Sequence, residues 1–345
     1  MKKLSFVTAS IFVMLVFVLF SCTKKSDPAP DPALKIGLVG GLGSFSDAGF
    51  NQNIYTGLQL ATADFPIISE ARESKTVSDI SASIDYFIAK GFNLVITAGF
   101  DAAQATVTAA NANPGTDFLL VDYSVANPPS NLLCAVFDVD QSSFPCGFLA
   151  AYWAYRQKPS NPVAGYVAGP AIPAIRQFSV SYANGIKYFN TQYQKNVLSL
   201  GYNATSFTDT LQGARLADSL MNRNASVIFA FAGTTGNGAL YKVKESGKWA
   251  IGVDVDQYIS IPQVGPVLLT SCMKGLDVMV YDVIYDYYNL YFPGGTVIHG
   301  DLANGGVAIA PFHDYEALIP DSIKAAIVII EGGIKNGQIK TGWPE

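Results

Sequence analysis

Short apolar runs alternate with amphipathic segments through the first part of the chain. Apolar residues fill both faces of four runs, at residues 35–39, 94–97, 118–122 and 132–137. Between these runs, apolar residues recur every three or four positions, as at Ile54, Leu58 and Ala61, which indicates helices with one buried face. Runs that are apolar on both faces are typical of parallel strands covered by helices on both sides.

A second series of the same kind begins near Ser142. After a helix at 148–155, its predicted strands lie at residues 162–169, 196–202, 226–233, 249–256 and 267–274. The chain ends with a Tyr-rich helix at 277–292, a strand at 307–311 and a helix after Glu316. Two successive series predict an α/β fold of two doubly wound, three-layer lobes. Because the Tyr-rich helix is apolar over most of its surface, we expect it to be packed between the sheet and its neighbours.

The chain begins with Met1, two lysines and an apolar run from residue 4 to residue 20, the pattern of a secretory signal. Ser21 directly before Cys22 resembles the cleavage box of bacterial lipoproteins. That resemblance implies a signal peptide at 1–21, a lipid on Cys22, and a protein anchored in the bacterial cell envelope that faces the periplasm or the exterior. The alternative is an uncleaved membrane helix, because a run of this length is near the lower limit of about 17 residues that span a bilayer.

Residues 23–32 are polar and proline-rich, with no bulky apolar side chain to bury. Such a segment stays extended, so we expect 22–34 to act as an anchor and spacer. No later stretch of the sequence is long and apolar enough to span a bilayer.

Composition and charge limit the possible partners. Half of the residues are hydrophobic and 14% are charged, which allows a large core. The formal charge of the whole chain is −5. It becomes more negative when the signal is removed, because Lys2 and Lys3 leave with it. An acidic protein without a cluster of Lys and Arg lacks the basic surface that nucleic acid requires, so nucleic acid is not expected as a partner.

The sequence offers little for catalysis or metal binding. It has two histidines, His299 and His313, and neither belongs to a triad, a phosphate-binding loop or a metal-binding motif. We therefore expect no catalytic residue, metal or cofactor. The three cysteines beyond Cys22 are Cys134, Cys146 and Cys272, which allow at most one disulfide or remain as buried thiols.

Distinctive side chains recur where the predicted strands end. In open α/β sheets ligands bind beyond the carboxyl ends of the strands, so these positions are candidates for a binding site. They are Asp47, Phe50, Asn51, Asp122, Phe207, Gly233, Asp254 and Lys274. Asp101, after the run at 94–97, stands where an N-cap of the next helix is expected. Each residue alone also has a structural explanation, and it is their shared location that favours a site.

The residue types suit a small, neutral, hydroxylated aromatic ligand. A carboxylate accepts two hydrogen bonds from neighbouring hydroxyls, and a lysine donates to the same hydroxyls. Phenyl rings such as Phe50 and Phe207 can hold a planar base between them, while Asn51 and Asp122 can contact its edge. Gly233, without a Cβ, lets backbone N–H groups come close to the ligand.

Several motifs, in order along nearly the whole mature chain, resemble the basic membrane protein family of bacterial lipoproteins, which includes purine nucleoside receptors. They include SDAGFNQNIYTGL (46–58), LVITAGFDAA (94–103), SFTDTLQG (206–213), FAGTTGNG (231–238) and LTSCMKGLDV (269–278). The chain departs from the family pattern at Ser46, Gly49, Pro145 and Cys146.

The resemblance implies a type I periplasmic-binding-protein fold, with two lobes joined by three crossings and a hinged central cleft. We expect the first lobe at 35–141 plus about 258–292, and the second at 142–257 plus about 293–345. It also implies base stacking by Phe50 and Phe207, contacts to the base edge from Asn51 and Asp122, and contacts to the ribose from Gly233, Asp254 and Lys274.

The sequence thus predicts a lipid-anchored substrate-binding protein, not an enzyme. It would capture a nucleoside, with a purine expected first, by hinge closure, and deliver it to the permease of an ABC transporter. Two alternatives stay open. One is a sugar-binding or sensor lipoprotein of the same fold, and the other is a hydrolase that uses only carboxylates.

Overall fold

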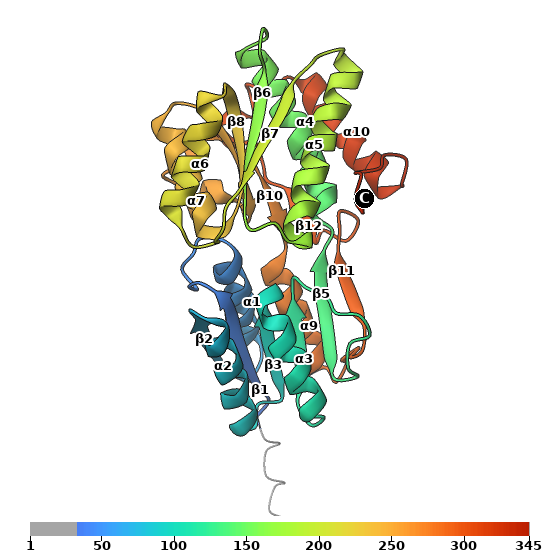
Figure 1. Ribbon diagram of the computed structural model, residues 1–345. Helices are drawn as coiled ribbons and strands as arrows, with labels where there is room; N and C mark the ends of the chain where they lie inside the picture. Colours follow the sequence, from blue (N-terminus) through green and yellow to red (C-terminus); the bar gives the residue numbers. More distant parts are fainter. Residues whose placement is uncertain (1–32, 345) are drawn as a thin grey trace, which may run out of the picture. The chain divides into compact units, whose positions relative to one another are not determined.

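The structure is a computed structural model that describes residues 33–344, so the predictions for the signal peptide and Cys22 lie outside the described residues. From Leu34 onward the chain forms one compact unit built on two six-stranded sheets (Figure 1). Helices cover both faces of each sheet. The predicted α/β fold of two doubly wound lobes is confirmed.

The first sheet has the strand order β11-β5-β4-β3-β1-β2, and all its strands are parallel. Its strands are β1 (Lys35–Leu42), β2 (Ile68–Ser74), β3 (Leu94–Ala98), β4 (Asp117–Val121), β5 (Leu132–Phe137) and β11 (Val297–Gly300). Its helices are α1 (Phe50–Asp64), α2 (Val77–Ala89), α3 (Ala103–Ala112) and α9 (Leu276–Tyr288). Helices α1 and α9 share a core with one face of the sheet, and α2 and α3 share a core with the other.

The second sheet has the order β12-β10-β9-β8-β6-β7, in which only β12 is antiparallel to its neighbour. Its strands are β6 (Val163–Ala168), β7 (Leu198–Asn203), β8 (Ala225–Phe231), β9 (Trp249–Asp254), β10 (Leu268–Lys274) and β12 (Val307–Ile309). Its helices are α4 (Val139–Gln157), α5 (Pro173–Tyr193), α6 (Thr210–Asn222), α7 (Gly233–Glu245), α8 (Gln257–Ser260) and α10 (Asp321–Lys335). The first five strands of each lobe have the same order, so the two lobes repeat one topology.

The chain passes between the lobes three times. It crosses from β5 to α4, from β10 to α9, and from β11 to β12. Two segments therefore lie in the lobe opposite to the one expected, because β10 pairs with β9 in the second sheet and β11 pairs with β5 in the first. The expected boundary placed 258–274 in the first lobe and 293–300 in the second. Each strand mixes apolar and polar residues, and the sequence carries no local signal for the sheet that each one joins.

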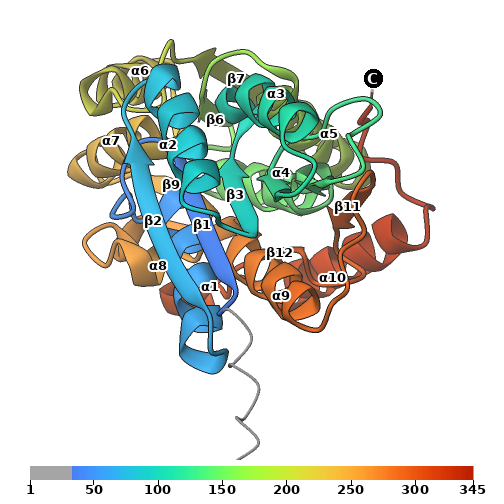
Figure 2. The ribbon, with the colours of Figure 1, turned by 90° about the horizontal axis from the view of Figure 1, so that it is seen from below.

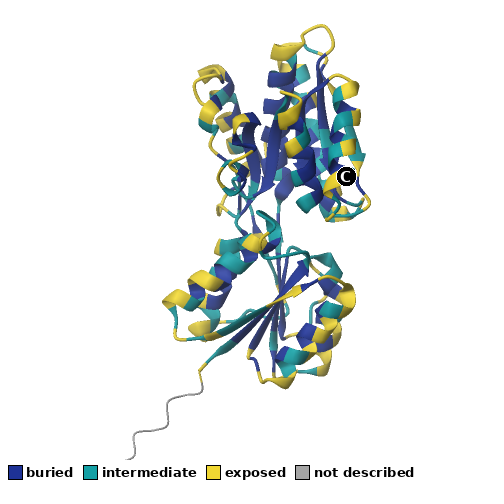
Figure 3. Cartoon of the chain, turned by 90° about the vertical axis from the view of Figure 1, so that its left-hand side faces the viewer, coloured by how far each residue is buried: buried dark blue, intermediate teal, exposed yellow. Residues whose placement is uncertain are grey.

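The core lies in the strands of both lobes, and exposure increases toward the outer faces of the helices (Figure 3). Helices α4 and α5 pack closely because glycines face each other's backbones. A Cβ on Gly147 would collide with the carbonyl of Tyr182, and a Cβ on Gly185 would collide with the carbonyl of Phe144. Within residues 33–344, none of the helices combines the length and the apolar character needed to cross a bilayer.

Three local predictions need correction. Strand β2 has a polar sequence and lies at the edge of its sheet, so its alternation of apolar residues is too weak to reveal it. Asp101 does not cap α3, because it lies within the short 3-10 helix η1 (Phe100–Ala102), and Ala102 precedes α3. The Tyr-rich helix α9 buries one face only, since Val278, Tyr285 and Tyr288 are exposed.

Candidate ligand-binding site

A cavity of about 120 Å³ lies where the carboxyl ends of the strands of the two lobes meet. All eight residues singled out in the sequence line this cavity, namely Asp47, Phe50, Asn51, Asp122, Phe207, Gly233, Asp254 and Lys274. The fold therefore brings together side chains that are more than 200 positions apart in the sequence. Their contacts with a ligand remain predictions.

A buried ion pair joins the two lobes inside the cavity. Lys274, at the end of β10, places its Nζ 2.8 Å from Oδ2 of Asp122, which follows β4 in the other lobe. The same Nζ lies 3.5 Å from Oδ1 of Asp254. Burial opposes the charged ammonium, but Asp122 and Asp254 outweigh it and raise the pKa of Lys274. Two carboxylates facing one ammonium leave an excess of acceptors, which suits a ligand that donates hydrogen bonds.

Asp122 and Asp254 occupy equivalent places in the two lobes, at the ends of β4 and β9. Both have left-handed backbones, with φ of 63° and 66°. Such a conformation is uncommon outside glycine, although Asp tolerates it better than most residues. Burial raises the pKa of Asp254 to about 6, and the charges of Asp122 and Asp47 add to this, while Lys274 opposes it. Asp254 therefore remains mostly ionised at neutral pH and takes up a proton as the pH falls through about 6.

Asn51 carries a buried acceptor without a partner. The Asp47 carboxylate accepts hydrogen bonds from the backbone N–H groups of Gly49, Asn51 and Gln52 and from the Asn51 side-chain Nδ2. Because an ionised carboxylate can only accept, Nδ2 must face Asp47, and the remaining atom, Oδ1, is buried without a hydrogen bond. An unpaired acceptor on a residue that lines the cavity is a candidate partner for a donor on the ligand. Asp47 itself is occupied in fixing the start of α1.

Five phenyl rings line the cavity, contributed by Phe50, Phe100, Phe178, Phe207 and Phe231. Phe100 of the first lobe and Phe207 of the second have ring centroids 6.2 Å apart. The ammonium of Lys274 lies over the Phe50 and Phe178 rings, at 5.5 and 5.2 Å from their centroids. The cavity thus has aromatic walls on both lobes and a charged group between them.

Gly233 begins α7 with a φ of 57°, a conformation that favours glycine. A Cβ at this position would stand 3.0 Å from the carbonyl oxygen of Phe207. The glycine thereby allows the loop that carries Phe207 to pack against the start of α7.

Several lining residues were not predicted. Phe100 and Asp101 directly follow β3, so the rule that ligands meet strand ends could have found them. Phe178 lies within α5, where its spacing is that of an ordinary core residue. Burial raises the pKa of the Asp101 carboxyl. Among the described residues, this carboxyl has no hydrogen-bond or ionic partner.

Outside the cavity, two hydrogen bonds fasten a loop of the first lobe to helices of the second. Asn237 in α7 donates from Nδ2 to the Asp47 carbonyl at 3.0 Å, and Ser260 in α8 donates from Oγ to the Ala48 carbonyl at 2.8 Å. Ala48 has a φ of 55° and packs against apolar residues of the second lobe. We call these four residues the lobe latch, and they hold the lobes together around the cavity.

The latch is connected to the cavity wall through Gln257. Its Nε2 donates to Oδ1 of Asn237 at 3.1 Å, and its Oε1 accepts from the backbone N–H of Val253 at 2.9 Å. Val253 lines the cavity directly before Asp254. The position of the latch is therefore coupled to the strand that carries a cavity carboxylate.

The two histidines lie outside the cavity. His299 places Nδ1 3.0 Å from Oδ1 of Asp138, and the backbone N–H of Asp138 donates to the Gly300 carbonyl, which ties two of the crossings together. His313 contacts the Asp256 carboxylate and stacks on Tyr258. Cys134, Cys146 and Cys272 are buried free thiols. In the described part of the chain, no three His, Cys, Asp or Glu side chains converge as a metal site does.

Comparison with known proteins agrees with this architecture. Residues 36–340 match the model of a family described as "Bmp: ABC transporter substrate-binding protein PnrA-like". The ABC transporter nucleoside-binding protein BmpA of Lactococcus lactis is 27% identical, with 97% of this chain and 99% of that protein covered. Basic membrane protein C of Borreliella burgdorferi is 26% identical over 98% of this chain and 95% of that protein.

A solved structure of similar fold is that of an ABC transporter solute-binding protein from Aeropyrum pernix. It superposes with a TM-score of 0.83 at 20% sequence identity, with 89% of this chain and 92% of that chain covered. The expected fold of a two-lobed periplasmic binding protein is therefore confirmed.

Proposed function

This chain belongs to the Bmp family of PnrA-like ABC transporter substrate-binding proteins, as its motifs predicted, and we propose that its substrate is a nucleoside. Proteins of this family bind substrates for transport and are not enzymes. Capture would occur in the cavity between the lobes, and the permease of an ABC transporter would receive the ligand. The observation that carries the proposal is the unpaired acceptor of Asn51, a residue that lines a cavity walled by phenyl rings.

The base would lie between Phe50 of the first lobe and Phe207 of the second. Stacking on aromatic rings contributes about 1–3 kcal/mol per base. A base that presents an N–H donor would satisfy Oδ1 of Asn51, which is otherwise buried without a partner. The planar, donor-bearing half of a nucleoside thus matches the first-lobe side of the cavity.

The ribose hydroxyls would meet Asp254, Lys274 and the backbone at Gly233. An ionised carboxylate accepts from two neighbouring hydroxyls, and such charge-assisted hydrogen bonds are stronger than neutral ones. The ammonium of Lys274 is held by two aspartates, so it is not free to bind a phosphate. The site therefore favours an unphosphorylated nucleoside over a nucleotide.

We also propose that the mature protein is held in the bacterial cell envelope by a lipid on Cys22. The sequence around Ser21 and Cys22 supports this, together with a relative from Pyrococcus abyssi that is named a lipoprotein and is 26% identical over 88% of this chain. Such an anchor would keep the cavity outside the cytoplasmic membrane, where substrates for uptake are met.

Isothermal titration of the ligand-free mature protein with nucleosides, nucleotides, free bases and sugars tests the proposed ligand. We expect heat with purine nucleosides, loss of that heat in Asn51→Ala, and normal binding in Asn222→Ala, a control on the exposed end of α6. If no nucleoside gives heat, the nucleoside proposal is wrong. Heat with sugars alone would identify the sugar-binding alternative.

A further inference from the structure

A group of aromatic and aliphatic side chains is exposed at the end of the first lobe that lies farthest from the cavity. Phe65, at the end of α1, has its ring 5.1 Å from that of Tyr288 and 5.8 Å from that of Tyr285, both in α9. The loop after α9 continues this surface. We call the group the tyrosine pole. It consists of the half-buried Phe65 and of the exposed Ile68, Tyr285, Tyr288, Leu290 and Tyr291.

The side chains of this group are apolar and unusually exposed for a surface in contact with water. Leu290 is 97% exposed and Tyr291 is 59% exposed, while Tyr285 and Ile68 are each 49% exposed. Leu290 also has a φ of 63°, a conformation that leucine adopts at a cost. A contiguous exposed apolar patch usually marks a surface that contacts a protein or a membrane.

The pole surrounds the place where the described lobe begins. The backbone N–H of Ile68 donates to the Leu34 carbonyl at 2.8 Å, directly before β1. Viewed from below, the start of β1 lies close to α1 and α9 (Figure 2). The exposed side chains and the point of attachment to the preceding segment therefore share one end of the lobe.

The length of that preceding segment limits how far this end can be from a lipid at Cys22. Eleven residues lie between Cys22 and Leu34, so the chain takes twelve residue steps from one to the other. Fully extended, they reach about 40 Å at most, and a proline-rich chain is slightly shorter. A lipid at Cys22 would thus hold the start of the lobe, and with it the tyrosine pole, within about 40 Å of the membrane.

We propose that the tyrosine pole docks on the surface of the lipid bilayer, a proposal that rests on the lipid anchor inferred above. Tyrosine suits the boundary between water and hydrocarbon, because its ring is apolar and its hydroxyl is polar. Leu290, at the tip of a loop, enters the headgroup region first. Docking would fix the direction in which the cavity faces the transporter.

The charges of the pole select the kind of lipid. Asp64, Asp282 and Asp286 lie among the tyrosines, and Asp64 accepts a hydrogen bond from the Tyr281 hydroxyl. These carboxylates oppose an anionic surface, so the apolar side chains must provide the attraction. The pole therefore favours zwitterionic lipid, and anionic lipid weakens docking in a way that salt reverses.

Quenching by brominated phosphatidylcholine tests the proposal with the full lipidated protein in vesicles. An environment-sensitive dye is attached to Leu290→Cys, and to Leu211→Cys as a control that is also exposed, on α6 of the second lobe. The native cysteines beyond Cys22 are buried, so they compete little for the dye. We expect quenching at position 290 and none at position 211, with less quenching when anionic lipid is added at low salt.

The outcomes separate the anchor from the docking. Protein that does not float with the vesicles overturns both proposals. Protein that floats but shows equal quenching at the two positions overturns docking and leaves the anchor intact. Energy transfer between dyes at position 290 of neighbouring molecules, without lipid quenching, would assign the surface to a second copy of the chain. Tyr288→Ser combined with Tyr291→Ser should reduce quenching at 290 without changing ligand affinity.

Discussion

Lys274 and Asp122 come from different lobes, and the 2.8 Å between Nζ and Oδ2 is the shortest ionic contact across the cavity in the described part of the chain. Asp254, on the strand next to that of Lys274, shares the same ammonium. The ion pair can form only when the lobes are together. The ion pair therefore stabilises the closed arrangement of the lobes, and the ammonium also offsets part of the negative charge in the cavity.

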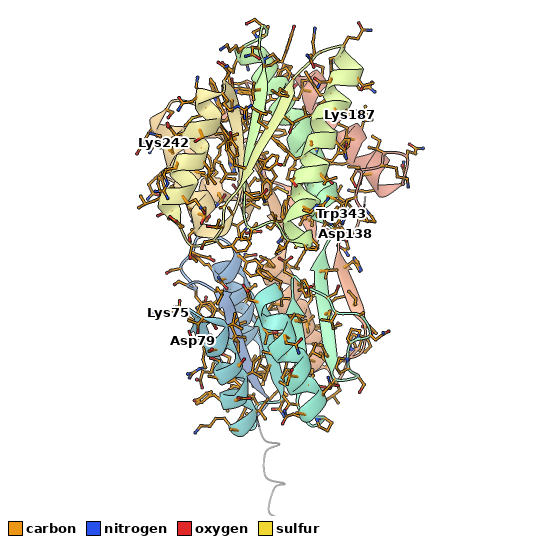
Figure 4. All side chains as sticks on the ribbon, in the orientation of Figure 1. Lys75, Asp79, Asp138, Lys187, Lys242 and Trp343 are labelled. Atoms are coloured by element: carbon orange, nitrogen blue, oxygen red, sulfur yellow. The ribbon has the colours of Figure 1, made fainter. Side chains whose placement is uncertain are left out.

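Replacing Lys274 with methionine should abolish ligand binding and destabilise the protein. The change leaves two buried carboxylates without a counter-ion, which costs about 3–5 kcal/mol, less if Asp254 takes up a proton. Thermal unfolding and isothermal titration measure the two effects. Lys187→Met, at an exposed position of α5, should change neither, and normal ligand affinity in Lys274→Met would contradict the proposed role (Figure 4).

Ligand affinity and stability should respond to pH in opposite directions because of Asp254. Its pKa is about 6 in the folded protein and about 4 in an unfolded chain. Between these values the folded protein holds a proton that the unfolded chain has released, so stability falls as pH rises from about 4 to about 6 and is then constant. Binding of a diol requires the ionised carboxylate, so affinity should weaken below pH 6.

Asp101 and Asp140 also have raised pKa values, so they add to the pH dependence of stability. The contribution of Asp254 is the difference between the stability profiles of the wild-type protein and Asp254→Asn. The variant should lose the fall in stability between pH 4 and 6 that Asp254 causes. Asp218→Asn, on the exposed surface of α6, should retain it. Denaturant unfolding across this range is the measurement, and an unchanged profile in Asp254→Asn would refute the assignment.

Removing the donor side chains of the lobe latch should weaken binding, although Asn237 and Ser260 do not line the cavity. Asn237→Ala and Ser260→Ala each delete one hydrogen bond between the lobes, worth about 1 kcal/mol, or about fivefold in affinity. Small-angle scattering should show a larger radius for the ligand-free variants. Ser219→Ala, which removes a hydrogen bond within α6, is the matched control, and equal affinities in all three would exclude a role in closure.

Two glycine substitutions should have opposite effects on stability, because one glycine lies in the contact between α4 and α5 and the other faces open space. Gly185→Ala would place a methyl group against the Phe144 carbonyl and should cost about 2 kcal/mol or more. Gly332→Ala, in α10, meets nothing within 4 Å and should stabilise by about 0.5–1 kcal/mol through higher helix propensity. Equilibrium unfolding of both variants decides this. A neutral Gly185→Ala would show that the two helices can separate without loss.

The strand ends made much of the site predictable. A parallel sheet sends the carboxyl ends of its strands to one edge, and ligands bind at that edge. The strand ends therefore predict that Asp122, Asp254 and Lys274 belong to one site. Their hydrogen bonds were not predictable. That Asp47 is occupied by backbone donors, whereas Asn51 keeps an open acceptor, depends on the local path of the loop before α1.

Pairing between distant strands was the part of the fold that local sequence did not determine. Strand β10 follows β9 in the chain and pairs with it in the second sheet. The predicted lobe boundary at residue 258 wrongly placed β10 in the first lobe. Strand β11 is four residues long and half exposed, so no alternation marks it. Phe178 was missed because a side chain that lines a cavity from within a helix has the same spacing as a core residue.

Gly275 follows Lys274 directly, and there the chain leaves the second sheet for a helix of the first lobe. A side chain so close to the pivot of the two halves travels only a short way when they swing apart. Asp254, on the adjacent strand, travels with it, so the lysine keeps a counter-charge even in an empty, opened receptor. If the lobes open to release a ligand, Lys274 loses Asp122 but keeps Asp254, so the site would not be left with a bare cation.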